Sequence, residues 1–317
     1  MTSVAVLGGG PDMEREVSIE SSTAVTKALV EAGFEAKLHL IDKPDSLTSI
    51  PGEVVFPVLH GRWGEGGPLQ DILERDGRPY VGCGPLAART CMDKIATKLE
   101  AARLGVRTPP ACLFNHSDRV AMDPPLVIKP ALEGSSVGLS ICRTPEDVDR
   151  AADVARRDLI QNPGQVTMVE RLIKGREITC PVIEQGGKLT ALPLIEIRPA
   201  EGVYDYEAKY KRDDTVYIVA PKDIDPAPIQ ADTLRLASAL GVRHLCRADF
   251  ILDEAGRHWL LEVNTMPGFT SHSLVPRAAA HTGMPMPALC AHLVRLAQAS
   301  HQNRAPNAPR LSSQPAR

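Results

Sequence analysis

Acidic and amide side chains flank one predicted hairpin late in the chain. Arg247 and Asp249 precede a turn at residues 255–256, and Glu262 and Asn264 follow it. If this turn contains two residues, Asp249 faces Glu262 and Arg247 faces Asn264 across the two strands. Because side chains two residues apart share one face of a strand, all four are predicted to lie on the same face.

Two directly opposed carboxylates repel each other, and a divalent cation between them removes this repulsion. Oxygen ligands from Asp, Glu and Asn suit Mg²⁺ or Mn²⁺, and Mg²⁺ usually binds together with substrate phosphates. The alternative is a solvated sheet face on which Arg247 balances the carboxylates. The spacing alone leaves both interpretations open.

A loop rich in Gly and Ser, at residues 133–138, follows Lys129. The backbone N–H groups of such a loop can bind phosphate oxygens, and a nearby lysine adds positive charge. The chain has no GxxxxGK[ST] pattern, and the glycines at 8–10 are followed by Pro11 rather than by a dinucleotide-binding fingerprint. The loop alone is therefore also typical of an ordinary glycine turn.

Three polar segments complete the set of residues that could do chemistry. Residues 14–18 and 60–67 each follow a short apolar run, and ligands of doubly wound sheets bind beyond the carboxyl ends of such strands. Residues 204–214 are charged and aromatic without core periodicity, which is typical of a surface loop that closes over a ligand. A helix start and a flexible loop are the alternatives for the first and the last segment.

The surrounding patterns predict the elements that position these residues. Strand and helix patterns alternate through residues 1–90, which predicts an α/β domain with a parallel, Rossmann-like sheet. Residues 91–173 predict a smaller α+β domain, and residues 174–302 predict an antiparallel α+β domain. One long helix is expected over 85–104, and the Pro- and Ser-rich residues 303–317 predict a disordered tail.

Composition excludes several classes of protein. Lys and Arg total 36 against 39 Asp and Glu, so no basic excess favours a nucleic-acid partner. No apolar run approaches the ~18–20 residues of a membrane span, so no membrane association is expected. The seven cysteines form no CxxC pair, which predicts a reducing, cytoplasmic location.

Taken in order, nine segments resemble the D-alanine–D-alanine ligase family of the ATP-grasp superfamily. They are EREVS at 14–18, LHGRWGEGG at 59–67, MDK at 92–94, VIKP at 127–130, EGSSVG at 133–138, VERLIKGRE at 169–177, YDYEAKY at 204–210, RAD at 247–249 and LEVNTMPGFTSHSL at 261–274. The resemblance spans about residues 3–298 and does not include the tail. The departures, at residues 11–13, Gly66 and Pro68, affect no residue that the chemistry needs.

The resemblance implies an ATP-grasp fold and the ATP-dependent joining of two D-alanines through an acyl phosphate, for peptidoglycan synthesis. ATP is then a co-substrate, used with two Mg²⁺ or Mn²⁺ ions, and a homodimer is compatible with this reading. The implied nucleotide-binding residues are Lys94 and Lys129 at the α- and β-phosphates, Lys209 at the γ-phosphate, and Glu170 and Glu177 at the adenine or ribose. The implied metal ligands are Asp249, Glu262 and Asn264.

The resemblance also implies roles around the two D-alanines. Glu14 anchors the ammonium group of the first D-alanine and His60 lies near it, whereas Ser273 and Leu274 receive the carboxylate of the second. Arg247 and the backbone at Gly268 stabilise the oxyanion of the tetrahedral intermediate. Ser135 and Tyr210 hydrogen-bond with Glu14 and close residues 204–214 over the site.

Three alternatives compete with this reading. A D-alanine–D-lactate ligase would use a hydroxyl nucleophile, and the resemblance associates Tyr210 with the dipeptide-forming branch. Another ATP-grasp carboxylate–amine ligase would keep the same chemistry with other substrates. A non-catalytic nucleotide-binding protein would predict a damaged metal set, but Asp249, Glu262 and Asn264 are all present.

Overall fold

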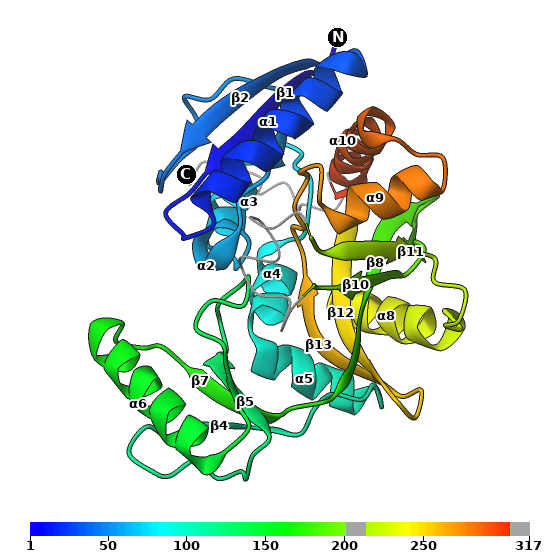
Figure 1. Cartoon of the computed structure of the whole chain (residues 1–317). Helices are drawn as coiled ribbons and strands as arrows, with labels where there is room; N and C mark the ends of the chain where they lie inside the picture. Colours follow the sequence, from blue (N-terminus) through cyan, green and yellow to red (C-terminus); the bar gives the residue numbers. More distant parts are fainter. Residues whose placement is uncertain (201–213, 305–317) are drawn as a thin grey trace, which may run out of the picture.

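The computed structural model describes residues 1–200 and 214–304, and these form three sheets with flanking helices (Figure 1). The strands are β1 (Ser3–Gly9), β2 (Glu35–Ile41), β3 (Val54–Pro57), β4 (Ala111–Leu113), β5 (Leu126–Pro130), β6 (Ser140–Cys142), β7 (Thr167–Arg171), β8 (Gly175–Gln185), β9 (Lys188–Ala191), β10 (Ile195–Arg198), β11 (Val216–Val219), β12 (Leu245–Asp253) and β13 (His258–Asn264). The helices are α1 (Arg15–Glu31), α2 (Gly61–Gly64), α3 (Pro68–Asp76), α4 (Pro85–Met92), α5 (Lys94–Arg103), α6 (Pro145–Gln161), α8 (Ala227–Ala239), α9 (Leu274–His281) and α10 (Met286–Arg304).

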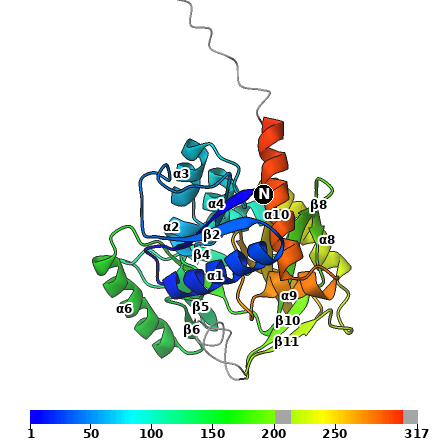
Figure 2. The same ribbon diagram turned by 90° about the horizontal axis from the view of Figure 1, so that it is seen from above.

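The first sheet is parallel, in the order β2-β1-β3, as the strand and helix alternation predicts. Its β1 and β3 strands are continuous apolar runs because both of their faces are covered. One face shares its core with α9 and α10, and Figures 1 and 2 both place α10 beside this part of the chain. Phe56 of β3 packs edge-to-face on Phe269, with 5.6 Å between the ring centroids.

The other two sheets are antiparallel. The four-stranded sheet runs β4-β7-β5-β6 with α6 packed against it, and the larger sheet runs β11-β10-β8-β12-β13 with β9 paired to β8. The model thus confirms the mixed α/β and α+β class, whereas the predicted domain boundaries at 90/91 and 173/174 stay predictions. Helix α10 continues to Arg304 and so includes the first two residues of the predicted tail, and residues 305–317 lie outside the described residues.

The single helix predicted over 85–104 is wrong, because the chain divides it at Asp93. This residue has an extended backbone (φ −79°, ψ 102°), and its carboxylate accepts the N–H groups of Ile95 and Ala96. Asp93 is therefore the N-cap of α5, a role for which Asp competes well against continued helix. The N–H of Lys94 bonds to Ala131 O at 3.1 Å, which fixes the start of α5 beside β5.

The β12–β13 hairpin has the predicted pairing at the acidic face but reaches it differently. The predicted two-residue turn is wrong: Asp253 pairs with Arg257 around a three-residue loop that ends with Gly256 at φ +74°. A bulge after Asp249 then shifts the register by one residue. The two irregularities compensate, so Asp249 does face Glu262 and Arg247 does face Asn264.

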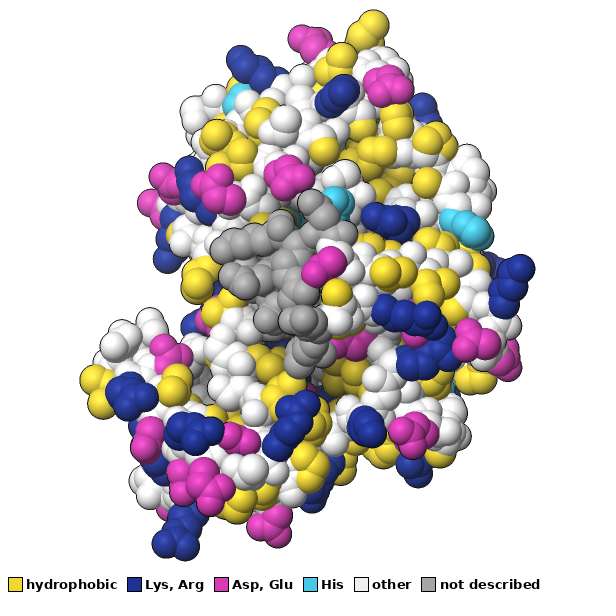
Figure 3. All heavy atoms as spheres, viewed as in Figure 1, with side chains coloured by type: hydrophobic (Ala, Val, Ile, Leu, Met, Phe, Trp, Pro, Cys, Tyr) yellow, Lys and Arg dark blue, Asp and Glu magenta, His cyan; other side chains and the backbone are white. Residues whose placement is uncertain are grey.

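Basic and acidic side chains are interspersed over the face drawn in Figure 3. Among residues 1–200 and 214–304, no helix is both long and apolar enough to cross a bilayer.

Asp93→Ala should lower the free energy of unfolding by about 1 kcal/mol, because two N–H groups at the start of α5 lose their acceptor. Urea denaturation monitored by circular dichroism measures this loss. The control is Asp45→Ala, which alters an exposed carboxylate between β2 and β3. An equal effect in both variants would contradict the capping role.

Candidate active site

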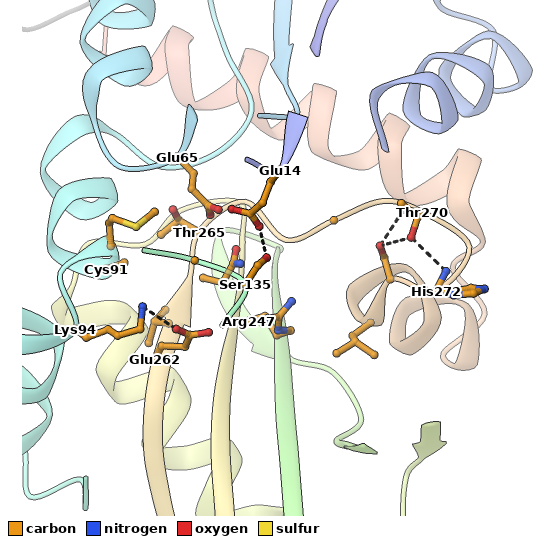
Figure 4. Close-up of a pocket in the computed structure, with 17 residues that line it drawn as sticks. Glu14, Glu65, Cys91, Lys94, Ser135, Arg247, Glu262, Thr265, Thr270 and His272 are labelled. Carbon is orange, nitrogen blue, oxygen red and sulfur yellow. Dashed lines mark hydrogen bonds and ion pairs between the residues drawn. The ribbon is translucent and has the colours of Figure 1, made fainter. Parts of the chain in front are cut away.

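Two adjoining pockets meet where the three sheets approach one another, and Lys94 and Glu262 line both of them. The first pocket receives side chains from the segments after β1, α4, β5 and β13 (Figure 4). The second pocket lies between the four-stranded sheet and the larger sheet, lined by Lys129, Glu177 and Phe250 among others. Most of the residues singled out from the sequence therefore line these two adjoining pockets.

The acidic face on β12 and β13 is charge-balanced within the protein. Arg247 donates two hydrogen bonds to Asp249, at 2.8 and 2.7 Å, and Thr179 of β8 donates another at 2.6 Å. Lys94 lies 3.1 Å from Glu262 Oε2, and its Nζ also donates to Glu133 O at 2.6 Å. The two opposed carboxylates thus each have a cation of their own, which offsets their repulsion.

The same face offers oxygen donors of the type that suits a divalent cation. Two carboxylates and the amide of Asn264 converge there, although Asn264 Oδ1 also accepts the N–H of Met266 at 3.0 Å. Within the described ranges, no group of three or more His, Cys, Asp or Glu side chains could hold a metal on its own. The donor set therefore fits Mg²⁺ if further oxygens come from a phosphate ligand.

Glu14 and Ser135 meet across the first pocket from distant parts of the sequence. Glu14 is the N-cap residue of α1, and the Ser135 hydroxyl donates to its carboxylate (Figure 4). Both side chains are buried. Gly134 permits this approach, since a Cβ there would lie 3.0 Å from Glu14 Oε2. Tyr210, the third member of the predicted contact, lies outside the described residues, as does Lys209.

His60 and Glu65 form a buried pair beneath Glu14. His60 Nδ1 lies 3.1 Å from Met266 O and 3.9 Å from Glu65 Oε1, and Glu65 accepts the N–H of Met266 at 3.2 Å. Burial lowers the pKa of His60, although Glu14 opposes this shift. Burial and the nearby Glu14 carboxylate raise the pKa of Glu65 well above its usual range. Both side chains therefore favour their neutral forms.

The segment between β13 and α9 forms the wall of the first pocket. Its Phe269 N–H bonds to Ser21 of α1 at 3.1 Å, and its Thr270 N–H bonds to Ser273 at 2.8 Å. A Cβ at Gly268 would lie 2.8 Å from Ser273 Oγ, so only glycine fits there without displacement. The backbone at Gly268 and the side chains of Ser273 and Leu274 thus line the same pocket as Arg247.

The predicted nucleotide-binding residues divide between two environments. Lys94, Lys129 and Glu177 line the second pocket. Glu170 is not among its lining residues: it lies behind Lys129, whose ammonium bonds to it. The position proposed for Glu170 beside adenine or ribose therefore gains no support from the shape of this pocket.

Sequence reasoning gave no role to several residues of the site. Glu65 follows Gly61 by one helical turn, and this spacing could have shown that it returns toward His60. Thr179 contacts Asp249 only because β8 pairs with β12, and Lys98 reaches Glu170 from a different element. No local pattern reports such contacts.

Comparisons with known proteins place the chain in a family. Residues 114–295, more than half of the chain, match the family model described as "D-ala D-ala ligase C-terminus". The chain is 42% identical over 315 residues to a D-alanine–D-alanine ligase of Bordetella pertussis, covering 96% of each protein. It is also 42% identical to D-alanine–D-alanine ligase B of Chromobacterium violaceum, covering 90% of this chain and 95% of that protein.

Solved structures show the same architecture. The D-alanine–D-alanine ligase of Bacillus anthracis complexed with ATP superposes with a TM-score of 0.79 at 27% identity, covering 95% of this chain and 98% of that one. The VanG D-Ala:D-Ser ligase of Enterococcus faecalis gives a TM-score of 0.78 at 27% identity, covering 93% and 99%. The predicted ATP-grasp architecture is confirmed.

The burial of His60 predicts a specific pH dependence of stability. Because its pKa is lower in the folded than in the unfolded protein, only the unfolded state gains this proton as the pH falls below about 6.5. The difference in free energy of unfolding, wild type minus His60→Gln, should therefore be smaller at pH 5 than at pH 7.5. The raised pKa of Glu65 makes stability depend on pH in the opposite direction. Because Glu65 is present in both proteins, this effect is common to both.

Urea titrations at the two pH values measure this difference. The control is His281→Gln, which removes an exposed imidazole at the end of α9 without opening a buried site. A wild-type advantage over His60→Gln that grows toward pH 5 would contradict the neutral, buried assignment of His60.

Proposed function

Because the chain belongs to the D-alanine–D-alanine ligase family, we propose that it joins two D-alanines to D-alanyl-D-alanine for peptidoglycan synthesis, converting ATP to ADP and phosphate. A carboxylate oxygen of the first D-alanine attacks the γ-phosphorus and ADP leaves. The neutral amine of the second D-alanine then attacks the acyl phosphate, and phosphate leaves. The observation that carries this proposal is that the pocket lined by Glu14 and Ser135 adjoins the lysine-lined pocket, with Lys94 and Glu262 lining both.

Nucleotide binding is assigned to the second pocket. Lys94 and Lys129 present ammonium groups to the phosphates, and Lys209 is proposed for the γ-phosphate. Glu177 lines the pocket and suits ribose hydroxyls. Apolar walls from Ile178, Phe250 and Leu261 suit a flat base. Glu170, proposed for the adenine or ribose, reaches this pocket only through its contact with Lys129.

Asp249, Glu262 and Asn264 would hold two Mg²⁺ or Mn²⁺ ions together with phosphate oxygens. When bound, such ions neutralise the phosphate charge that otherwise repels an incoming carboxylate. Arg247 and Thr179 hold the Asp249 carboxylate in place. Lys94 competes for Glu262, so this lysine has to leave the carboxylate when Glu262 becomes a ligand.

Substrate binding is assigned to the first pocket. Glu14, held by Ser135, receives the ammonium group of the first D-alanine, next to His60. Ser273 and Leu274 receive the carboxylate of the second D-alanine. Arg247 and the backbone at Gly268 face the developing oxyanion. Enclosure of this pocket matters because water would hydrolyse an acyl phosphate.

Location and assembly extend the proposal. All seven cysteines are free thiols, which supports a cytoplasmic location. The homodimer stays a prediction, which sedimentation analysis can test.

Phosphate release measured with ATP, Mg²⁺ and D-alanine tests the activity. D-Alanine should support release, whereas L-alanine should not, and mass spectrometry should find the dipeptide. Tyr210, which the resemblance associates with dipeptide formation, lies outside the described residues. D-Lactate and D-serine offered in place of the second D-alanine therefore test the specificity for this substrate. A larger rate of mixed product than of D-alanyl-D-alanine would overturn the assigned specificity.

Glu262→Gln should lower turnover by more than about tenfold at saturating Mg²⁺, because the substitution keeps the shape but removes a metal-binding charge. Its free energy of unfolding without metal should not fall by more than about 1 kcal/mol, since the repulsion from Asp249 also disappears. The control is Glu254→Gln on the exposed loop of the same hairpin. Turnover close to wild type in Glu262→Gln would refute the metal assignment.

A further inference from the structure

Three charged side chains are buried together at the edge of the second pocket. Lys98 of α5, Lys129 of β5 and Glu170 of β7 are 8%, 7% and 3% exposed. Lys129 Nζ bonds to Glu170 Oε1, and Lys98 Nζ lies 2.9 Å from Glu170 Oε2. Lys98 also donates to Thr108 Oγ1 at 2.8 Å. One carboxylate therefore holds two ammonium groups, one on each oxygen.

The two lysines differ in what else they can reach. Lys129 lines the second pocket, whereas neither Lys98 nor Glu170 is among its lining residues. In the sheet, Glu170 pairs with Val127, so Lys129 is its diagonal neighbour on the same face. Lys98 reaches the other oxygen of the carboxylate from α5. Only Lys129 can therefore exchange Glu170 for a ligand in the pocket.

This exchange raises an energetic problem that a second cation resolves. A buried carboxylate that loses its only ion-pair partner costs several kcal/mol. Burial opposes ionisation of Glu170, and Lys129 and Lys98 together outweigh this effect and lower the pKa of the carboxyl. If Lys129 turned to a phosphate and Lys98 were absent, Glu170 would be a buried, unpaired charge.

We propose that Lys98 is a positioning residue for nucleotide binding: it remains on Glu170 as a permanent counter-ion, so that Lys129 can leave Glu170 for a phosphate oxygen. The inference rests on the proposed function, since it takes ATP as the ligand of the second pocket. Lys98 itself touches no ligand in this arrangement. Its contribution is to lower the free-energy cost of moving Lys129.

Nucleotide affinity, measured by calorimetry with ATP and Mg²⁺ in the absence of D-alanine, tests the inference. Lys98→Met should bind ATP at least about tenfold more weakly than wild type, because Lys129 is then held by Glu170. Adding Glu170→Gln to Lys98→Met should recover most of this loss, since the competing carboxylate is gone. Lys98→Arg keeps a cation at the position and should bind ATP nearly as well as wild type.

A purely structural role for Lys98 predicts a different result: the double variant would bind ATP no more tightly than Lys98→Met. Matched controls on the same helix are Arg103→Met and Arg103→Met/Glu100→Gln, which dismantle an exposed ion pair. Neither control should change ATP affinity. Unchanged affinity in Lys98→Met, or no recovery in the folded double variant, would overturn the proposal.

The inference can also be tested without the single Lys98→Met variant. If Lys98→Met does not fold, Glu170→Gln is compared with the double variant: once the carboxylate is absent, losing Lys98 should leave ATP affinity unchanged. A loss there would show that Lys98 acts on the nucleotide directly and would overturn the inference. Failure of wild type itself to bind ATP would instead refute the proposed function.

Discussion

Two carboxylates that face each other across β12 and β13 impose the constraint on which the site depends. Asp249 and Glu262 are neutralised by cations from different elements, Arg247 on the same strand and Lys94 at the start of α5. Lys94 has this position because Asp93 ends α4 and caps the next helix. A local break in one helix thus supplies the charge that the acidic face requires.

The wall of the substrate pocket depends equally on contacts between distant segments. The residues between β13 and α9 bond to Ser21 of α1 and to the buried Glu65. Phe269 of the same segment packs on Phe56 in the first sheet. The parallel sheet and the larger antiparallel sheet are therefore joined at the site itself, so a change in their packing moves the backbone at Gly268.

Local periodicity predicted most elements, because burial patterns within a strand or helix are written in adjacent residues. The parallel sheet within residues 1–90 was predicted, and the Asp249–Glu262 pairing was predicted although its turn was not. A three-residue loop and a bulge have no effect on pairing when they cancel, and the sequence pattern cannot separate them from a two-residue turn. The contacts of Glu65 and Lys98 depend on how separate elements pack, which local periodicity does not encode.

The site cations already have carboxylate partners: Lys94 with Glu262, Lys129 with Glu170, and Arg247 with Asp249. Phosphate binding is consequently an exchange of partners, and its free energy is the difference between two sets of ion pairs. Lys94 becomes available to a phosphate only when Glu262 finds another cation. Nucleotide and divalent-metal binding must therefore favour each other, and by linkage each raises the affinity for the other by the same factor.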